Sequence, residues 1–162
     1  MARAYISIGS NIEPLRYIPS SIHSLGEYYD KLILSSVYET EAVGFEGDNF
    51  YNLVVGFDTK MEVHKVVETL KQIENDNNRQ RTSERFSART LDLDLLLYDD
   101  LILKDEIVDI PRDEILKYAF VILPLAEIAP QSLHPITKQS YRDLAQAFDT
   151  NGQAIWRVNI DI

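Results

Sequence analysis

The chain has 162 residues, of which 45% are hydrophobic and 26% charged, with a formal net charge of −10 and no cysteine. The absence of cysteine excludes a disulfide framework and a cysteine-based zinc site, and the acidity disfavours non-specific nucleic-acid binding. No apolar run approaches the ~20 residues of a membrane span. From this length we expect one domain over residues 1–162, in a monomeric protein. We expect it to be cytoplasmic, because Met1-Ala2-Arg3 leads into a strand rather than a signal peptide.

The first part of the chain predicts a strand, a helix and two further strands. Residues 5–8 read as a buried strand, and Gly9-Ser10-Asn11 ends it and can cap the next helix. That helix has an apolar face made by Leu15, Ile18, Ile22 and Leu25. Apolar runs over residues 32–38 and 50–57 predict the second and third strands, with a loop over 44–49 between them.

The clearest helix follows the third strand. Thr59 and Glu62 have the spacing of a capping box. Apolar residues then recur at helical period, at Val63, Val66, Val67, Leu70 and Ile73. The polar run Asn75-Asp76-Asn77-Asn78 ends this helix, because short polar side chains compete for backbone hydrogen bonds.

A local excess of arginine comes next, against the acidic background of the whole chain. Four arginines lie within residues 79–89, namely Arg79, Arg81, Arg85 and Arg89. Guanidinium groups at this density repel one another unless an anion lies among them, and their planar shape suits phosphate oxygens. This segment therefore indicates a phosphate-binding site.

The arginines lead directly into a strand over residues 91–98 that contains Asp92 and Asp94. Side chains two apart on a strand share a face, so both carboxylates are expected to point the same way and could hold Mg²⁺ between them. Two structural interpretations compete with this one. The aspartates could be solvated on a half-exposed edge strand, or they could form an ion-pair network with the nearby arginines.

The remaining elements complete the expected fold. Leu101-Ile102-Leu103 is expected to form a hairpin with the aspartate strand, residues 118–125 and 140–148 are helical candidates, and 154–160 is a last strand. The order β-α-β-β-α-β followed by these additions fits an α+β ferredoxin-like βαββαβ sandwich with extra C-terminal helices and a strand.

The run RTLDLDLLLY at residues 89–98 resembles the signature of the 6-hydroxymethyl-7,8-dihydropterin pyrophosphokinases, enzymes of folate biosynthesis. The resemblance extends to residues 4–11, 38–40, 50–52, 73–74, 110–111 and 123–130, in family order. It implies the same ferredoxin-like core. It also implies an ATP-dependent diphosphotransferase that converts the pterin hydroxymethyl to its diphosphate and releases AMP.

The resemblance also implies roles for particular residues. Asp92 and Asp94 would hold two Mg²⁺, with Arg79 and Arg89 stabilising charge on the transferring group. Nucleotide contacts would come from Lys71, Glu74, Arg81, Arg85, Leu95 and Arg112. Pterin contacts would come from Thr40, Val43, Phe50, Asn52, Phe86 and Phe120. On sequence alone, Glu74 could equally be a solvated helix residue, Asn52 a satisfied core amide, and the phenylalanines ordinary core residues.

Four departures from the family pattern leave alternatives open. Phe86-Ser87-Ala88 replaces the usual Trp-Gly-Pro, Arg112 replaces a histidine, and Ile107 and Tyr118 stand where arginines are frequent. These differences allow a divergent pterin- or nucleotide-binding paralogue with little turnover. An unrelated ferredoxin-like interaction module, in which the charged segment is only an ion-pair network, is the third interpretation.

Overall fold

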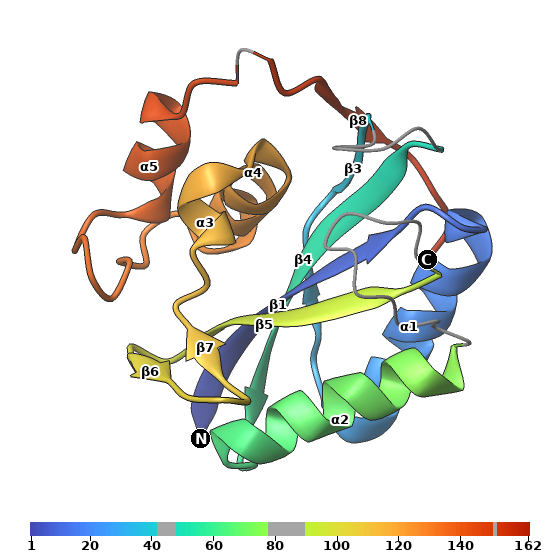
Figure 1. Cartoon of the computed structure of the whole chain (residues 1–162), viewed down its shortest axis with the longest axis horizontal. Coiled ribbons are helices and arrows are strands. Elements are labelled where there is room, and N and C mark those ends of the chain that lie inside the picture. Colours follow the sequence, from blue (N-terminus) through green and yellow to red (C-terminus); the bar gives the residue numbers. More distant parts are fainter. Residues whose placement is uncertain (42–47, 78–89, 151) are drawn as a thin grey trace.

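The structure is a computed structural model that describes residues 1–41, 48–77, 90–150 and 152–162 (Figure 1). Its centre is an antiparallel sheet in the order β5-β1-β4-β3-β8, and a short strand β2 also pairs with β4. The strands are β1 (Ala2–Ser10), β2 (Ile33–Leu34), β3 (Val37–Thr40), β4 (Phe50–Thr59), β5 (Asp92–Tyr98) and β8 (Ile155–Val158).

The connections confirm the predicted ferredoxin-like fold. Helix α1 (Pro14–Tyr28) follows β1, and α2 (Val63–Asp76) links β4 to β5. The last strand of the βαββαβ unit, β5, therefore pairs with the first, β1, at one end of the sheet. Strand β8 extends the other end by pairing with β3. The predicted strand 32–38 is interrupted at Ser35, whose hydroxyl accepts a hydrogen bond from Val54 N at 2.9 Å.

Helices cover both faces of the sheet (Figure 1), and a hydrophobic layer lies between the sheet and the helices on each face. Helices α1 and α2 cover one face through residues such as Ile18, Leu25, Val66 and Leu70, which pack with Ile8 of β1. The short α3 (Glu114–Lys117), α4 (Ala119–Ile128) and α5 (Tyr141–Ala147) lie over the other face. Because alternate side chains of a strand point to opposite faces, the long strands β1, β4 and β5 contribute to both layers.

Three local predictions were wrong, and each failure has a tertiary cause. Leu103 does not pair with the aspartate strand; β6 (Leu103–Lys104) pairs with β7 (Asp109–Ile110) in a separate small hairpin. Helix α2 is capped by Glu62, whose carboxylate accepts from His64 N and Lys65 N, because β4 continues through Thr59. Strand β1 likewise continues through Ser10, so α1 begins after Glu13.

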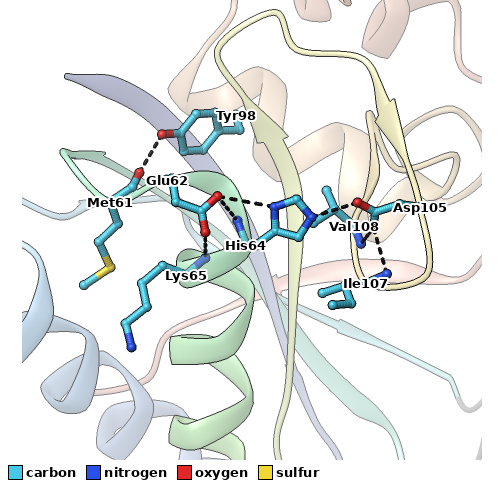
Figure 2. A network of polar contacts seen from close by, with 8 residues as sticks. All are labelled: Met61, Glu62, His64, Lys65, Tyr98, Asp105, Ile107 and Val108. Carbon is cyan, nitrogen blue, oxygen red and sulfur yellow. Dashed lines mark hydrogen bonds and ion pairs between the residues drawn. The ribbon is translucent and has the colours of Figure 1, made fainter.

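The first turn of α2 is tied to the small hairpin by charged side chains (Figure 2). His64 lies between two carboxylates, with Nε2 at 2.7 Å from Asp105 Oδ2 and Nδ1 at 3.3 Å from Glu62 Oε2. These partners raise the pKa of His64 above 6.5, Asp105 having the larger effect. The pKa of Asp105 is lowered to about 2, first by its hydrogen bond from Val108 N and then by His64.

We expect an NMR titration to place the pKa of His64 above 6.5, and Asp105→Asn to lower it. The sign follows from linkage: a histidine whose pKa is raised on folding stabilises the folded state fully below its unfolded pKa. This contribution is lost as the pH rises through the folded-state value. The difference in melting temperature between wild type and Asp105→Asn should therefore shrink above that pH. A pKa for His64 at or below 6.5 would contradict the contacts in Figure 2.

Candidate active site

Asp92 and Asp94 lie on the same face of β5, as the alternation predicted. In the register of the sheet, Asp92 is opposite Gly9 and Asp94 is opposite Ser7. Leu93 and Leu95 point into the layer under α1 and α2. The two aspartates, both half-buried, therefore face the side of the sheet on which α4 lies.

Negative charge is concentrated around Asp94. Its pKa is raised, first by loss of hydration and then by the charge of Asp92, with smaller contributions from Glu74 and Glu114. The Arg112 guanidinium acts in the opposite direction. Like charges held this close disfavour ionisation of both groups unless a cation lies among them. The site is therefore electrostatically suited to a bound cation.

A cavity of about 140 Å³ runs along the free edge of β5. Helix α2 lines it with Val67, Leu70, Lys71 and Glu74, and β5 with Leu93, Asp94 and Leu95. The hairpin side is formed by residues 107–110 and Arg112. The four described residues expected at a nucleotide, Lys71, Glu74, Leu95 and Arg112, thus line one cavity that also reaches Asp94.

Glu74 is buried rather than solvated, with 2% of its surface exposed. Its Oε2 accepts a hydrogen bond from Leu93 N at 2.7 Å, at the peptide between the two aspartates. The contact satisfies a backbone donor at the edge of the sheet and fixes the end of α2 to β5. The sequence could not distinguish this role from an exposed helix position.

Arg112 is held beside the aspartates by a residue that sequence reasoning missed. Its Nε and Nη2 donate to the two carboxylate oxygens of Glu114, at 2.8 and 3.0 Å. Its backbone N donates to Leu96 O at 3.1 Å, which attaches the segment after the hairpin to the edge of β5. Nothing in the sequence marked Glu114, because the pairing depends on the turn between β7 and α3.

The expected pterin residues that the structure describes, Thr40, Phe50, Asn52 and Phe120, lie on the same face of the sheet as the aspartates. Asn52 is opposite Gly9 on one side and Tyr38 on the other, and Phe50 is opposite Thr40. Asp92, Gly9 and Asn52 thus form a row across three strands. Because adjacent strands are ~4.8 Å apart, the backbones of Asp92 and Asn52 are separated by roughly 10 Å. Asn52 is buried, and its Nδ2 donates to Thr40 Oγ1 at 3.4 Å.

Helix α4 brings Phe120 to this face. Phe120 and Thr40 line a second cavity, of about 280 Å³, together with Tyr118 and the segment before β8. The rings of Tyr118 and Phe120 stack with centroids 5.0 Å apart. Gln153, which the sequence did not single out, accepts from Ala119 N at 2.8 Å and donates to Lys117 O at 3.1 Å. It joins the start of α4 to the C-terminal segment.

Several expected site residues lie outside the described residues: Val43, Arg79, Arg81, Arg85, Phe86 and Arg89. Within the described ranges, no group of three or more His, Cys, Asp or Glu side chains is arranged to hold a metal ion. Within the same ranges, no helix has the length and apolar character needed to span a membrane.

Comparison with known proteins identifies the family. The model of 7,8-dihydro-6-hydroxymethylpterin-pyrophosphokinase (HPPK) matches residues 5–130. The 2-amino-4-hydroxy-6-hydroxymethyldihydropteridine pyrophosphokinase of Aquifex aeolicus (strain VF5) is 33% identical over 147 residues, which are 88% of this chain and 90% of that protein. The protein of the same name from Bacillus subtilis (strain 168) is 32% identical over 158 residues, 95% and 90% of the two chains.

Solved structures show the same fold. The crystal structure of wild-type Plasmodium falciparum HPPK-DHPS with SDX-DHP superposes with a TM-score of 0.67 at 15% identity. The match covers 90% of this chain and 43% of that one. With the family model matching most of its length and two relatives above 30% identity, the chain belongs to the 7,8-dihydro-6-hydroxymethylpterin-pyrophosphokinase family.

Proposed function

We propose that the protein transfers a pyrophosphoryl group from ATP to 6-hydroxymethyl-7,8-dihydropterin, giving AMP and the pterin diphosphate for folate biosynthesis. Membership of the family supports this activity. The observation that carries the proposal is the position of Asp92 and Asp94. They lie on the face shared with Asn52, and Asp94 also lines the cavity along the edge of β5. The two carboxylates are therefore where two bound substrates would meet.

The carboxylate pair fits Mg²⁺ bound together with a nucleotide. Mg²⁺ takes oxygen ligands and is usually held by one or two carboxylates plus substrate phosphates rather than by an all-protein cage. A pair of aspartates with no third acidic or histidine ligand in the described part of the chain agrees with that pattern. When bound, Mg²⁺ would neutralise phosphate charge and lower the pKa of the substrate hydroxyl.

The protein's own part in the reaction is to hold and orient the two substrates. Lys71 and Arg112 supply positive charge on opposite sides of the edge cavity, and Glu74 holds β5 in place through Leu93 N. We assign the remaining phosphate contacts to Arg79, Arg81, Arg85 and Arg89, because their density on the sequence suits the triphosphate. Among them, Arg79 and Arg89 would stabilise the charge that develops during transfer.

The pterin would lie on the α4 face of the sheet. The Asn52 amide has both donors and an acceptor for the edge of the heterocycle, and Thr40 adds a hydroxyl beside it. The rings of Phe50 and Phe120 are suited to contact a flat heterocycle. We assign Val43 and Phe86 to the same pocket on the family resemblance alone.

A second candidate, a nucleotide-binding paralogue with little turnover, is favoured by one observation: the guanidinium of Arg112 is already engaged by Glu114. Incubation of the protein with ATP, Mg²⁺ and 6-hydroxymethyl-7,8-dihydropterin separates the two functions. The pyrophosphokinase should release AMP and form pterin diphosphate in equal amounts, and only when the pterin is present. ATP binding without AMP release would support the paralogue, and absence of ATP binding would refute both.

We expect Asp94→Asn to lower kcat by roughly 10³-fold, because losing one metal ligand removes several kcal/mol of transition-state stabilisation. The variant should fold, since the charge it removes is repelled by Asp92. Asp100→Asn is the matched control: the residue is exposed, in the turn after the same strand, and should leave kcat unchanged. Near-normal turnover of Asp94→Asn at saturating Mg²⁺ and ATP would exclude the metal assignment.

Gly9→Ala tests the pterin side of the site. A Cβ at Gly9 would lie 2.9 Å from Asn52 Oδ1, so the amide must turn away. The Asn52 amide would then lose one or two hydrogen bonds to the pterin, at ~1 kcal/mol each, and the KM for the pterin should rise by about tenfold. The KM for ATP should stay the same.

Gly26→Ala is the control for this substitution. Among the described residues, a Cβ at Gly26 meets nothing within 4 Å, so both KM values should match those of wild type. Helix α1 should be stabilised by roughly 0.5–1 kcal/mol. Unchanged pterin KM in Gly9→Ala would show that Asn52 does not contact the pterin.

A further inference from the structure

One face of α2 continues beyond the nucleotide cavity proposed above. Val67, Lys71 and Glu74 line that cavity, and His64 lies one turn before them, at the spacing i, i+3, i+7 and i+10 that keeps side chains on one side of a helix. His64 therefore faces the same hairpin that forms the opposite side of the cavity. Its Nε2 lies 2.7 Å from Asp105 Oδ2 on that hairpin.

Asp105 connects His64 to residues that line the cavity. Its other oxygen, Oδ1, accepts from Ile107 N at 2.8 Å and from Val108 N at 2.7 Å. Its backbone N donates to Val108 O at 2.8 Å. These three bonds close the turn of the hairpin, and Ile107 and Val108 line the cavity. One carboxylate thus binds both the helix and the turn that carries the lining residues (Figure 2).

The helix side and the hairpin side of the cavity are held by different contacts. The start of α2 is fixed by the Glu62 cap and by the Tyr98 hydroxyl, which donates to Met61 O. The hairpin has strands of only two residues each, β6 and β7. Its inward side chains Val108 and Ile110 are buried in the core, whereas residues 105–107 of its turn are exposed, so a charged contact from the fixed helix can determine where the turn lies.

We propose that His64 is a positioning residue for nucleotide binding: through Asp105 it holds the hairpin against α2 and so sets the width of the cavity along β5. The inference rests on the proposed function, because it takes this cavity to be the nucleotide site. Loss of the His64 side chain is therefore expected to impair one property only. Nucleotide affinity depends on His64, whereas pterin affinity and turnover at saturating nucleotide do not, since His64 touches neither the aspartate pair nor the α4 face.

The test is calorimetric binding of α,β-methylene-ATP with Mg²⁺, alongside steady-state kinetics, for wild type, His64→Ala and His64→Gln. His64→Ala should weaken nucleotide binding by about two- to fivefold, the range of one partly exposed ion pair. The kcat and the pterin KM should be unchanged. His64→Gln should restore part of the affinity, because its amide can still donate to Asp105. His23→Ala, an exposed histidine of α1 near Glu27, is the matched control and should bind as wild type does.

The outcomes separate the inference from the proposed function. If wild type fails to bind the nucleotide, the proposed function is wrong. If wild type binds and His64→Ala binds equally well, only the inference is wrong. Parallel losses of nucleotide affinity, pterin affinity and kcat in His64→Ala would also overturn it, because they would show a general structural role. Melting temperatures of all variants identify any failure to fold.

Discussion

The hydrogen bond from Leu93 N to Glu74 Oε2 joins α2, which lines the edge cavity, to the strand that carries the two aspartates. Strand β5 is at the end of the sheet, and an edge strand leaves backbone donors without a strand partner. A buried carboxylate from α2 satisfies one of them, at the peptide between Asp92 and Asp94. A charged acceptor in a poorly hydrated place forms a strong bond, so this contact holds the end of α2 against the aspartate strand. The cavity along β5 lies between α2 and the small hairpin.

The sheet separates stability from chemistry by side-chain alternation. Leu93 and Leu95 of β5 pack under α1 and α2, while the aspartates of the same strand face the side that carries Asn52, Thr40 and Phe120. This face holds negative charges close together around Asp94, and their repulsion destabilises the folded protein. Packing of the leucine layer offsets this repulsion, and a bound cation would remove it. Arg112 acts to lower the pKa of Asp94, whereas its partner Glu114 acts to raise it, so the pair leaves the site negatively charged.

Local sequence patterns predicted what depends on neighbours in the chain. The strand period placed Asp92 and Asp94 on one face, and the helical period located α2 with its end near Asn77. Patterns could not predict contacts made by folding. The burial of Glu74, the Arg112–Glu114 pair and the bridge made by Gln153 join residues whose relation appears only in three dimensions. The wrong pairing of Leu103 has the same origin, because β7 competes successfully for it. The arginines outside the described residues stay predictions.

The most direct test of this account is NMR relaxation enhancement by Mn²⁺ in place of Mg²⁺, measured with α,β-methylene-ATP bound. The broadening of amide signals falls steeply with distance from the metal, so it locates the ion on the fold. We expect the strongest broadening at Asp92, Leu93 and Asp94, with Gly9 of β1 next and α5 little affected. Strongest broadening at any other acidic cluster, or none on β5, would contradict the claim that this carboxylate pair is the centre of the site.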